Sequence, residues 1–358
     1  MLSSIAKPFA ALALAAALIS IVLAALGASP VGVFAALGEG AFGSWYACVD
    51  TIVKSTPLVF TGLAVSLAFS GALWNIGADG QLTIGAIAAG AIGPHLGNFP
   101  HAIAIAIILA AGVLGGAVWG GVAGWLRARR DVNEVISTIM LNFVAVQALS
   151  WVVHGPLMEP SHAYPTSSPI ARAAQLEFYF APSRINLGMI LAVVLAAACY
   201  LLLFRTGAGF ELRAMGCNRR AATFFAVRIP ALTFWVMALS GALAGLGGAV
   251  QISAISHRLY EKLSPGWGFE AIAVALVARL NPLGIIPAAI LFGALDNGSQ
   301  AMQRTQGISP ELVQVIQGLV ILIILAFDTP AWSGLRENIF GAPHDAAAVP
   351  PVAEMPDA

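Results

Sequence analysis

Three acidic side chains fall inside or at the edges of long apolar stretches of the sequence: Asp79, Glu270 and Asp296. An ionisable group at membrane depth is costly, and it therefore marks a functional site by default. A carboxylate in such a place can line a polar translocation cavity, or it can lie at a helix end and reach the interface with its polar head. Both interpretations stay open for Glu270 and Asp296.

The stretch 74–81, W-N-I-G-A-D-G-Q, interrupts an apolar run with glycines and with the polar side chains of Asn75, Asp79 and Gln81. Broken backbone at membrane depth is tolerated only where protein buries it or where it lines a wet cavity. One interpretation is an element that lines a pathway. The other is a short cytoplasmic turn between two spans, in which Asp79 caps the next helix.

Thr138 and Asn142 are four residues apart and share one face of a predicted helix. Asn142 lies about 12 Å along this helix from Glu134, near mid-membrane. An amide at that depth either bonds to a neighbouring helix or lines a polar pathway. At the start of the same helix, Asp131 and Glu134 have the spacing of a capping box, in which the two side chains satisfy free backbone N–H groups.

Motifs for covalent chemistry are missing from the sequence. A protein that hydrolyses its own ATP needs a phosphate-binding loop that ends in Gly-Lys-Ser/Thr, and Lys7, Lys54 and Lys262, the three lysines, do not lie in such a setting. There is no His-Glu-x-x-His motif and no Gly-x-Ser-x-Gly motif, and the 3 cysteines are far apart. We therefore expect no catalytic site, no bound metal and no cofactor.

The composition indicates a membrane protein. Of the 358 residues, 59% are hydrophobic and 9% are charged, whereas soluble domains carry roughly 25% charged residues. So few charges cannot build a water-facing surface, which argues against a soluble enzyme or a secreted protein. The formal net charge is zero, so the basic footprint of a nucleic-acid-binding protein is absent.

A helix that crosses ~30 Å of hydrocarbon needs about 20 mostly apolar residues, and about ten stretches qualify. Most Lys and Arg residues fall in segments that are cytoplasmic if the N-terminus is inside. The sequence thus predicts an all-α fold, a polytopic membrane helical bundle of about ten transmembrane helices, N-in and C-in. The alternative for the first stretch is a signal peptide. The stretches cover residues 9–28, 55–74, 80–96, 101–125, 134–153, 185–204, 230–251, 267–281, 283–303 and 311–327.

We expect residues 1–339 to form one transmembrane domain and residues 340–358, which are rich in Ala and Pro, to form a disordered cytoplasmic tail. The domain includes a proline-containing external loop at 154–184 and a basic cytoplasmic segment at 205–229.

Small residues recur every four positions in two of the predicted spans, which places them on one helix face and lets helices approach closely. They are Gly112, Gly116, Gly120 and Gly124 in one span, and Gly241, Gly245 and Ala249 in the other.

Residues 209–222, G-F-E-L-R-A-M-G-C-N-R-R-A-A, predict a short amphipathic helix, a backbone break at Gly216 and a second helix. One interpretation is a basic loop that only fixes the membrane topology. The other is a docking element for a cytoplasmic motor subunit.

Five stretches, taken in order, resemble the permease subunit of a bacterial binding-protein-dependent ABC importer of the nucleoside and simple-sugar class. The resemblance runs from about residue 50 to 327, and 133–142 is similar to the nucleoside-type member of a permease pair. Asp79 stands where this family more usually has Glu. The stretches are 75–81 (N-I-G-A-D-G-Q), 133–142 (N-E-V-I-S-T-I-M-L-N), 212–222 (L-R-A-M-G-C-N-R-R-A-A), 238–248 (A-L-S-G-A-L-A-G-L-G-G) and 266–298.

The resemblance implies a permease in the bacterial inner membrane, in contact with lipid, that has no ATPase or catalytic site of its own. The implied partners are ATP-binding ABC subunits, a second homologous permease subunit and an external solute-binding lipoprotein, without nucleic acid. Residues 211–222 match the cytoplasmic helix that sits in a cleft of the ATPase. The implied coupling residues are Glu211, Arg213, Gly216, Asn218, Ala221 and Ala222.

An ion-coupled secondary transporter of a small polar solute is the alternative, because such proteins also use broken helices and membrane acids. The basic helical segment and the ordered motifs favour the importer. The sequence does not separate a nucleoside from a ribose-like sugar or another ribosyl compound as the solute. The predicted pathway residues are Asn75, Asp79, Gln81, Thr138, Asn142, Glu270 and Asp296, and in the alternative function Asp79, Glu270 and Asp296 could serve as the membrane acids.

Overall fold

The structure, a computed structural model, describes residues 29–178 and 184–307 together with residues 17, 20, 21, 24, 315 and 318. The expected first and last spans lie almost entirely outside these residues, and the expected tail lies wholly outside them. Within the described part the regular structure is helical, apart from isolated bridges, so the predicted all-helical fold is confirmed.

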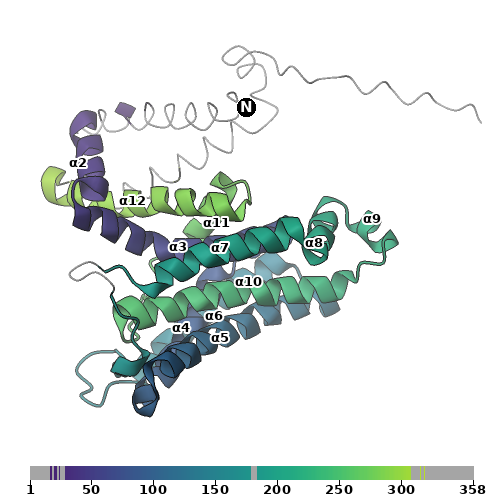
Figure 1. Cartoon of the computed structure of the whole chain (residues 1–358), viewed down its shortest axis with the longest axis horizontal. Coiled ribbons are helices and arrows are strands. Elements are labelled where there is room, and N and C mark those ends of the chain that lie inside the picture. Colours follow the sequence, from purple (N-terminus) through teal and green to yellow (C-terminus); the bar gives the residue numbers. More distant parts are fainter. Residues whose placement is uncertain are drawn as a thin grey trace, which may run out of the picture. The chain divides into compact units, whose positions relative to one another are not determined.

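In chain order the helices are α2 (Pro30–Phe42), α3 (Trp45–Ser70), α4 (Ala78–Ile92), η1 (Gly93–Asn98), α5 (His101–Arg130), α6 (Glu134–His154), η2 (Arg172–Ala174), α7 (Leu187–Arg205), α8 (Gly207–Cys217), α9 (Arg219–Phe224), α10 (Ile229–Gln251), η3 (Ile252–Ser256), α11 (Trp267–Val277) and α12 (Pro282–Gln306) (Figure 1). The turn η3 is π-helical and continues α10. Helix α2 was not predicted.

Five helices in the described part are long and apolar enough to cross a membrane: α3, α5, α6, α7 and α10 with η3. Each matches one of the predicted spans, with bounds shifted most at α3, which starts at Trp45 rather than at residue 55. Helices α4 and α11 have 15 and 11 residues, so they are only about 22 and 16 Å long. Helix α11 cannot cross the hydrocarbon alone, whereas α4 continues without a break into η1.

Helix α5 has two faces of opposite character. Its glycines Gly112, Gly116, Gly120 and Gly124 face α10, which lies alongside it (Figure 1). Leu114 and Val118, halfway round the helix, are 64% and 66% exposed. An apolar exposed face opposite a buried small-residue face is what a lipid-facing helix of a bundle requires.

The close approach of α5 and α10 depends on glycine. A Cβ at Gly116 would overlap the carbonyl oxygen of Gly241, and a Cβ at Gly112 would overlap the Cβ of Ala249. The small-residue faces predicted from the sequence are thus confirmed as a helix–helix contact.

The described bundle has two distinct ends. Helices α5 and α10 are antiparallel, because Gly112 contacts Ala249 while Gly124 contacts Phe234. The segment α8–α9 lies at the end where α5 stops and α10 starts, whereas residues 155–178 lie at the opposite end (Figure 1). We call these the α8–α9 end and the loop end.

The irregular loop predicted for 154–184 is observed where the structure describes it. Backbone hydrogen bonds tie it to the segment after η3, from Ser167 N to Leu259 O at 2.9 Å and from Ile170 N to His257 O at 2.8 Å. The loop is therefore held against the end of α10.

The capping box predicted at Asp131 and Glu134 is wrong. Asn133 caps α6, since its Oδ1 accepts from Val135 N at 2.9 Å. Both acids instead bind Arg127, with Nη1 at 2.7 Å from Asp131 and Nε at 3.0 Å from Glu134. The arginine at the end of α5 takes the carboxylates because it lies one turn from Asp131.

The break predicted at Gly216 lies two residues later. Asn218 ends α8 and caps α9, accepting from Ala221 N at 3.0 Å, because its side chain can replace the missing backbone partner. Gly216 is helical, and a Cβ there would overlap the Ser70 carbonyl oxygen at the end of α3. This glycine serves close packing rather than a turn.

Candidate functional site: polar groups within the bundle

Asn75 lies in the non-helical segment 71–77 and is bonded on all sides. Its Nδ2 donates to Gln81 Oε1 at 2.9 Å and to Ser240 Oγ at 2.7 Å. Its Oδ1 accepts from Gly77 N at 2.9 Å and from Gln81 Nε2 at 3.1 Å. Ser240 in turn donates to the Ala64 carbonyl at 2.6 Å. These groups join α3, α4 and α10.

Asn142 and Thr138 attach the same broken segment to α6. Asn142 Oδ1 accepts from Gly80 N, and its Nδ2 donates to Ile76 O, both at 2.8 Å. Thr138 Oγ1 accepts from Ile76 N at 3.3 Å and donates to Glu134 O at 2.6 Å. Backbone freed by a helix break must find partners inside a membrane bundle, and these side chains supply them.

Asp79 caps a helix other than its own. Its Oδ1 accepts from Ser264 Oγ at 2.6 Å and from Gly268 N at 3.0 Å. Ser264 Oγ also accepts from Gly266 N and Trp267 N, each at 3.2 Å. The carboxylate, itself in the first turn of α4, thus lies at the N-terminus of α11, where a negative charge is favourable.

The starts of the two short helices are in close contact. A Cβ at Gly268 would overlap the backbone nitrogen of Asp79. Two discontinuous helices that meet at their N-termini inside a bundle are a feature of transporter folds. The break predicted at 74–81 is therefore observed, with Asp79 joining it to α11 rather than capping α4.

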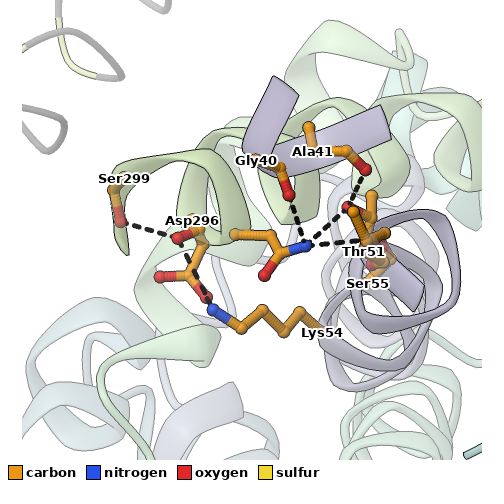
Figure 2. A network of polar contacts seen from close by, with 9 residues as sticks. Gly40, Ala41, Thr51, Lys54, Ser55, Asp296 and Ser299 are labelled. Atoms are coloured by element: carbon orange, nitrogen blue, oxygen red, sulfur yellow. Dashed lines mark hydrogen bonds and ion pairs between the residues drawn. The ribbon is translucent and has the colours of Figure 1, made fainter. Parts of the chain in front are cut away.

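Glu270 and Asp296 have different surroundings. Glu270 is half-buried one turn into α11, and among the described residues its side chain has no hydrogen bond or ion pair. Asp296 is exposed on α12 and binds Lys54 of α3, with Oδ2 3.0 Å from Nζ (Figure 2). Sequence reasoning missed Lys54 as a partner, although a lone lysine in an apolar helix is as unusual as a lone acid.

Asn297, beside this ion pair, has an amide whose orientation is fixed by its partners. The two hydrogens of its Nδ2 are shared among three acceptors, the Gly40 and Ala47 carbonyls and Thr51 Oγ1, at 3.1, 3.0 and 3.1 Å. The Thr51 hydroxyl donates to the Ala41 carbonyl at 2.8 Å, so it must accept from Asn297 (Figure 2). The nitrogen therefore points to α2 and α3. Sequence reasoning did not single out Asn297.

A polar cavity of about 280 Å³ lies between α3, α10, α11 and α12. The predicted pathway residues are absent from its described lining, although Lys54, the partner of Asp296, is part of it. The side chains that line it were not predicted, because they come from segments far apart in the sequence. The polar residues among them are Asp50, Lys54, Arg184, Gln251, Asn297 and Gln300.

The α8–α9 segment exposes only part of the predicted coupling residues. Glu211 and Asn218 are exposed, whereas Ala222 is buried. Arg213 is half-buried, with its guanidinium 5.1 Å from the centroid of the Phe204 ring. A feature missed in the sequence is the tip of α9.

At that tip, Phe224 and Phe225 are 91% and 82% exposed. Arg219 and Arg220 beside them are also exposed. An exposed aromatic pair near basic residues is unusual for a water-facing surface and marks a contact with another protein or with the membrane.

Apolar outer faces, helices of spanning length and polar groups satisfied inside the bundle define an integral membrane protein. The comparison with known sequences gives the family. A family model described as "Branched-chain amino acid transport system / permease component" matches residues 47–325, and the chain belongs to this family of permease components.

Three curated relatives cover most of the chain. It is 31% identical over 315 residues to the glucose ABC transporter permease protein TsgB13 of Haloferax volcanii, spanning 85% of this chain and 83% of the relative. It is 33% identical over 328 residues to the guanosine ABC transporter permease protein NupP of Bacillus subtilis, spanning 90% and 93%. It is 29% identical over 314 residues to the nucleoside ABC transporter permease protein NupB of Lactococcus lactis, spanning 85% and 86%. No solved structure matches the chain.

The predicted class, an ABC importer permease, is thereby confirmed. A permease of this kind works with ATP-binding subunits and a solute-binding protein. The alternative of an ion-coupled secondary transporter is not favoured by these relatives.

Proposed function

We propose that this permease moves a nucleoside, or a related ribosyl or simple-sugar solute, across the bacterial inner membrane, driven by ATP that a separate subunit hydrolyses. The observation that carries the proposal is the 33% identity to a permease named for guanosine over 90% of this chain. A relative named for glucose is similarly close, which keeps sugars within the proposed solute class.

In the proposed topology about ten helices cross the membrane, with both termini inside. The α8–α9 end is cytoplasmic and the loop end external. Arg127, Arg129, Arg130, Arg219 and Arg220 lie toward the α8–α9 end, as the excess of basic residues on cytoplasmic sides requires. Residues 1–339 form the permease domain, and 340–358 form the cytoplasmic tail.

The proposed partners include a second, homologous permease subunit and a lipoprotein that delivers the solute from outside. The ATPase is proposed to bind α8–α9 through exposed Glu211 and Asn218 and through the tip of α9. Arg213, Gly216, Ala221 and Ala222, the other predicted coupling residues, are proposed to position these contacts from within the segment.

For the pathway we propose a division of roles among the predicted residues. Glu270 and Asp296 face the polar route near the cavity, since one is unpaired among the described residues and the other is half-exposed. The other five support the broken helices that shape the route, because their polar atoms already have protein partners. They are Asn75, Asp79, Gln81, Thr138 and Asn142.

Uptake measurements test the proposed function. A bacterial strain that lacks this gene, together with the same strain complemented by it, is given labelled guanosine, uridine, ribose and glucose. We expect uptake of at least one nucleoside to depend on the gene and to stop when the ATPase subunit is inactivated. Uptake that persists without ATP hydrolysis, or that is absent for all four solutes, would contradict the proposal.

A further inference from the structure

We propose that the cavity between α3, α10, α11 and α12 is a solute-binding site for a neutral nucleoside, with Trp267 against the base. This inference deepens the proposed function and rests on it. The cavity volume of about 280 Å³ is near the lower end of the roughly 300–1,000 Å³ that small-molecule sites occupy. Such a volume suits a compact solute.

Charges of both signs lie at the cavity, so no single sign of solute charge is favoured. Lys54 of the lining is paired with Asp296, which lies outside it, at 3.0 Å, and Asp50 and Arg184 are the other charged lining residues, one of each sign. A charged solute would add an uncompensated charge in a place that is partly shielded from water, which is costly. A solute without formal charge meets no such cost.

Asn297 offers an acceptor to the cavity. All three of its hydrogen bonds run from Nδ2, and no described residue donates to its Oδ1. The amide cannot be turned round, because two of its partners are backbone carbonyls that only accept. Its oxygen is therefore held in place and available to a donor such as a ribose hydroxyl or the N–H of a base.

Two further amides complete the polar lining. Gln251 donates from Nε2 to Ser256 Oγ at 3.3 Å, while its Oε1 has no donor among the described residues. The side chain of Gln300 has no hydrogen bond within the described part, and it is exposed. Amides both donate and accept, as recognition of a base edge and of hydroxyls requires.

The backbone around the cavity is irregular on two sides. Pro57 inside α3 removes the hydrogen bond that its N–H would make to the Val53 carbonyl, and both residues line the cavity. On the other side, the π-helical turn η3 follows Gln251 and contributes Ile255 to the lining. Turns of this kind occur frequently at functional sites.

Trp267 contributes an aromatic side chain to the lining, which favours a solute with a flat ring. It is the one aromatic residue among the described residues of the lining, and its indole N–H has no acceptor in the described part. An aromatic face stacks on any base, and the loss of such a face costs about fivefold or more in affinity. A free sugar would use the amides but would lack the flat ring.

The test uses the complete importer, with its ATPase and solute-binding partners, in proteoliposomes that take up labelled guanosine and uridine. We expect Trp267→Leu to lower nucleoside uptake at least fivefold per assembled complex, and Gln300→Ala to lower it at least about twofold. Trp267→Phe keeps an aromatic face and should retain most of the uptake. There are two matched controls, and neither should change nucleoside uptake. One is Gln303→Ala, one turn further along α12 and outside the lining, and the other is Trp151→Leu, at an exposed tryptophan on α6.

A second measurement does not depend on transport. The Gln300→Cys variant of the complex, with the native cysteines replaced by alanine, is alkylated with a maleimide. A nucleoside at saturating concentration should slow alkylation at position 300 at least threefold, whereas ribose at the same concentration, which lacks the flat ring, should slow it less, and a nucleoside monophosphate should not slow it.

The outcomes separate two failures. Normal nucleoside uptake by both Trp267→Leu and Gln300→Ala, or equal protection by ribose and nucleoside, would overturn the site while leaving the proposed transport intact. An unchanged complex that takes up no nucleoside would overturn the proposed function, and this inference with it.

Discussion

At Asn142 a single amide serves two backbone groups of a broken segment, the N–H of Gly80 and the carbonyl of Ile76. The residue types at 75–81 and at 142 predicted polar sites at membrane depth. Their partners could not be predicted, since Ser240, which binds Asn75, is 165 residues away. A hydrogen-bonding side chain in an apolar helix indicates a polar group inside the membrane. Whether it binds a solute or a backbone group depends on how the helices pack.

Replacing Asn142 tests this distinction. Asn142→Leu keeps the volume similar but leaves a buried N–H and a buried carbonyl without partners, which should cost about 1–3 kcal/mol. We expect less assembled complex in the membrane and nearly unchanged uptake per complex, from quantitative blotting beside uptake assays. Asn142→Leu with full assembly and lost uptake would instead make this residue part of the solute route.

Asp79 should behave as a structural residue of the same kind. Asp79→Ala removes the acceptor of Gly268 N and Ser264 Oγ and should lower the thermal stability of the purified complex by about 2 kcal/mol. Asp79→Asn keeps an oxygen in place, so we expect a smaller loss. A melting temperature that is the same for Asp79→Ala as for the unchanged protein would show that the two short helices do not need this carboxylate.

The long helices and the short ones differ in how well the sequence predicts them. The predicted span 134–153 is observed as Glu134–His154, because apolar length and a polar cap mark it. Helices α4 and α11 were predicted as spans, but α11 has only about 16 Å of helix, roughly half the ~30 Å of hydrocarbon, and the α-helical part of α4 is about 22 Å long before it continues as η1. Their N-termini meet in the bundle, and hydropathy does not report such a contact.

Glycine at the α5–α10 contact sets the distance between the two helices. Gly116→Ala places a methyl group against the Gly241 carbonyl and should destabilise the bundle by about 1–3 kcal/mol. Gly38→Ala in α2 is the control, because nothing lies within 4 Å of the added Cβ. The amount of detergent-stable protein after heating measures both. Equal stability of Gly116→Ala and Gly38→Ala would mean that the helices can separate without cost.

For the molecule as a whole, the sequence predicted the membrane class and the family. The predicted number of spans includes the stretches 9–28 and 311–327, which lie almost entirely outside the described residues, and the proposed orientation rests on the distribution of Lys and Arg. The polar cavity could not be foreseen, because its lining comes from residues between Asp50 and Gln300. Residues so far apart become neighbours only once the helices are packed.

Thiol labelling of intact cells tests the orientation. Cys217 at the end of α8 is exposed, and a membrane-impermeant reagent should label it only after the cells are made permeable. Ser161→Cys in the loop, made with the native cysteines replaced by alanine, should be labelled in intact cells. The reverse pattern would place the α8–α9 end outside.

The glycine at 216 has a mechanical consequence. It lets α8 pack closely against the Ser70 carbonyl at the end of α3. Segment 71–77 connects this end of α3 to α4, where the Asp79 carboxylate accepts a hydrogen bond from Gly268 N, next to Trp267. Because contacts that leave no room for a methyl group are hardly compressible, a movement of α8 should displace α3 and the segments connected to it. Gly216→Ala should therefore raise the number of ATP molecules hydrolysed per solute imported. Gly207→Ala on the same helix is the control, because nothing lies within 4 Å of the added Cβ, and it should leave the ratio unchanged. Equal ratios for both variants would show that movement of α8 is not transmitted through the Gly216 contact.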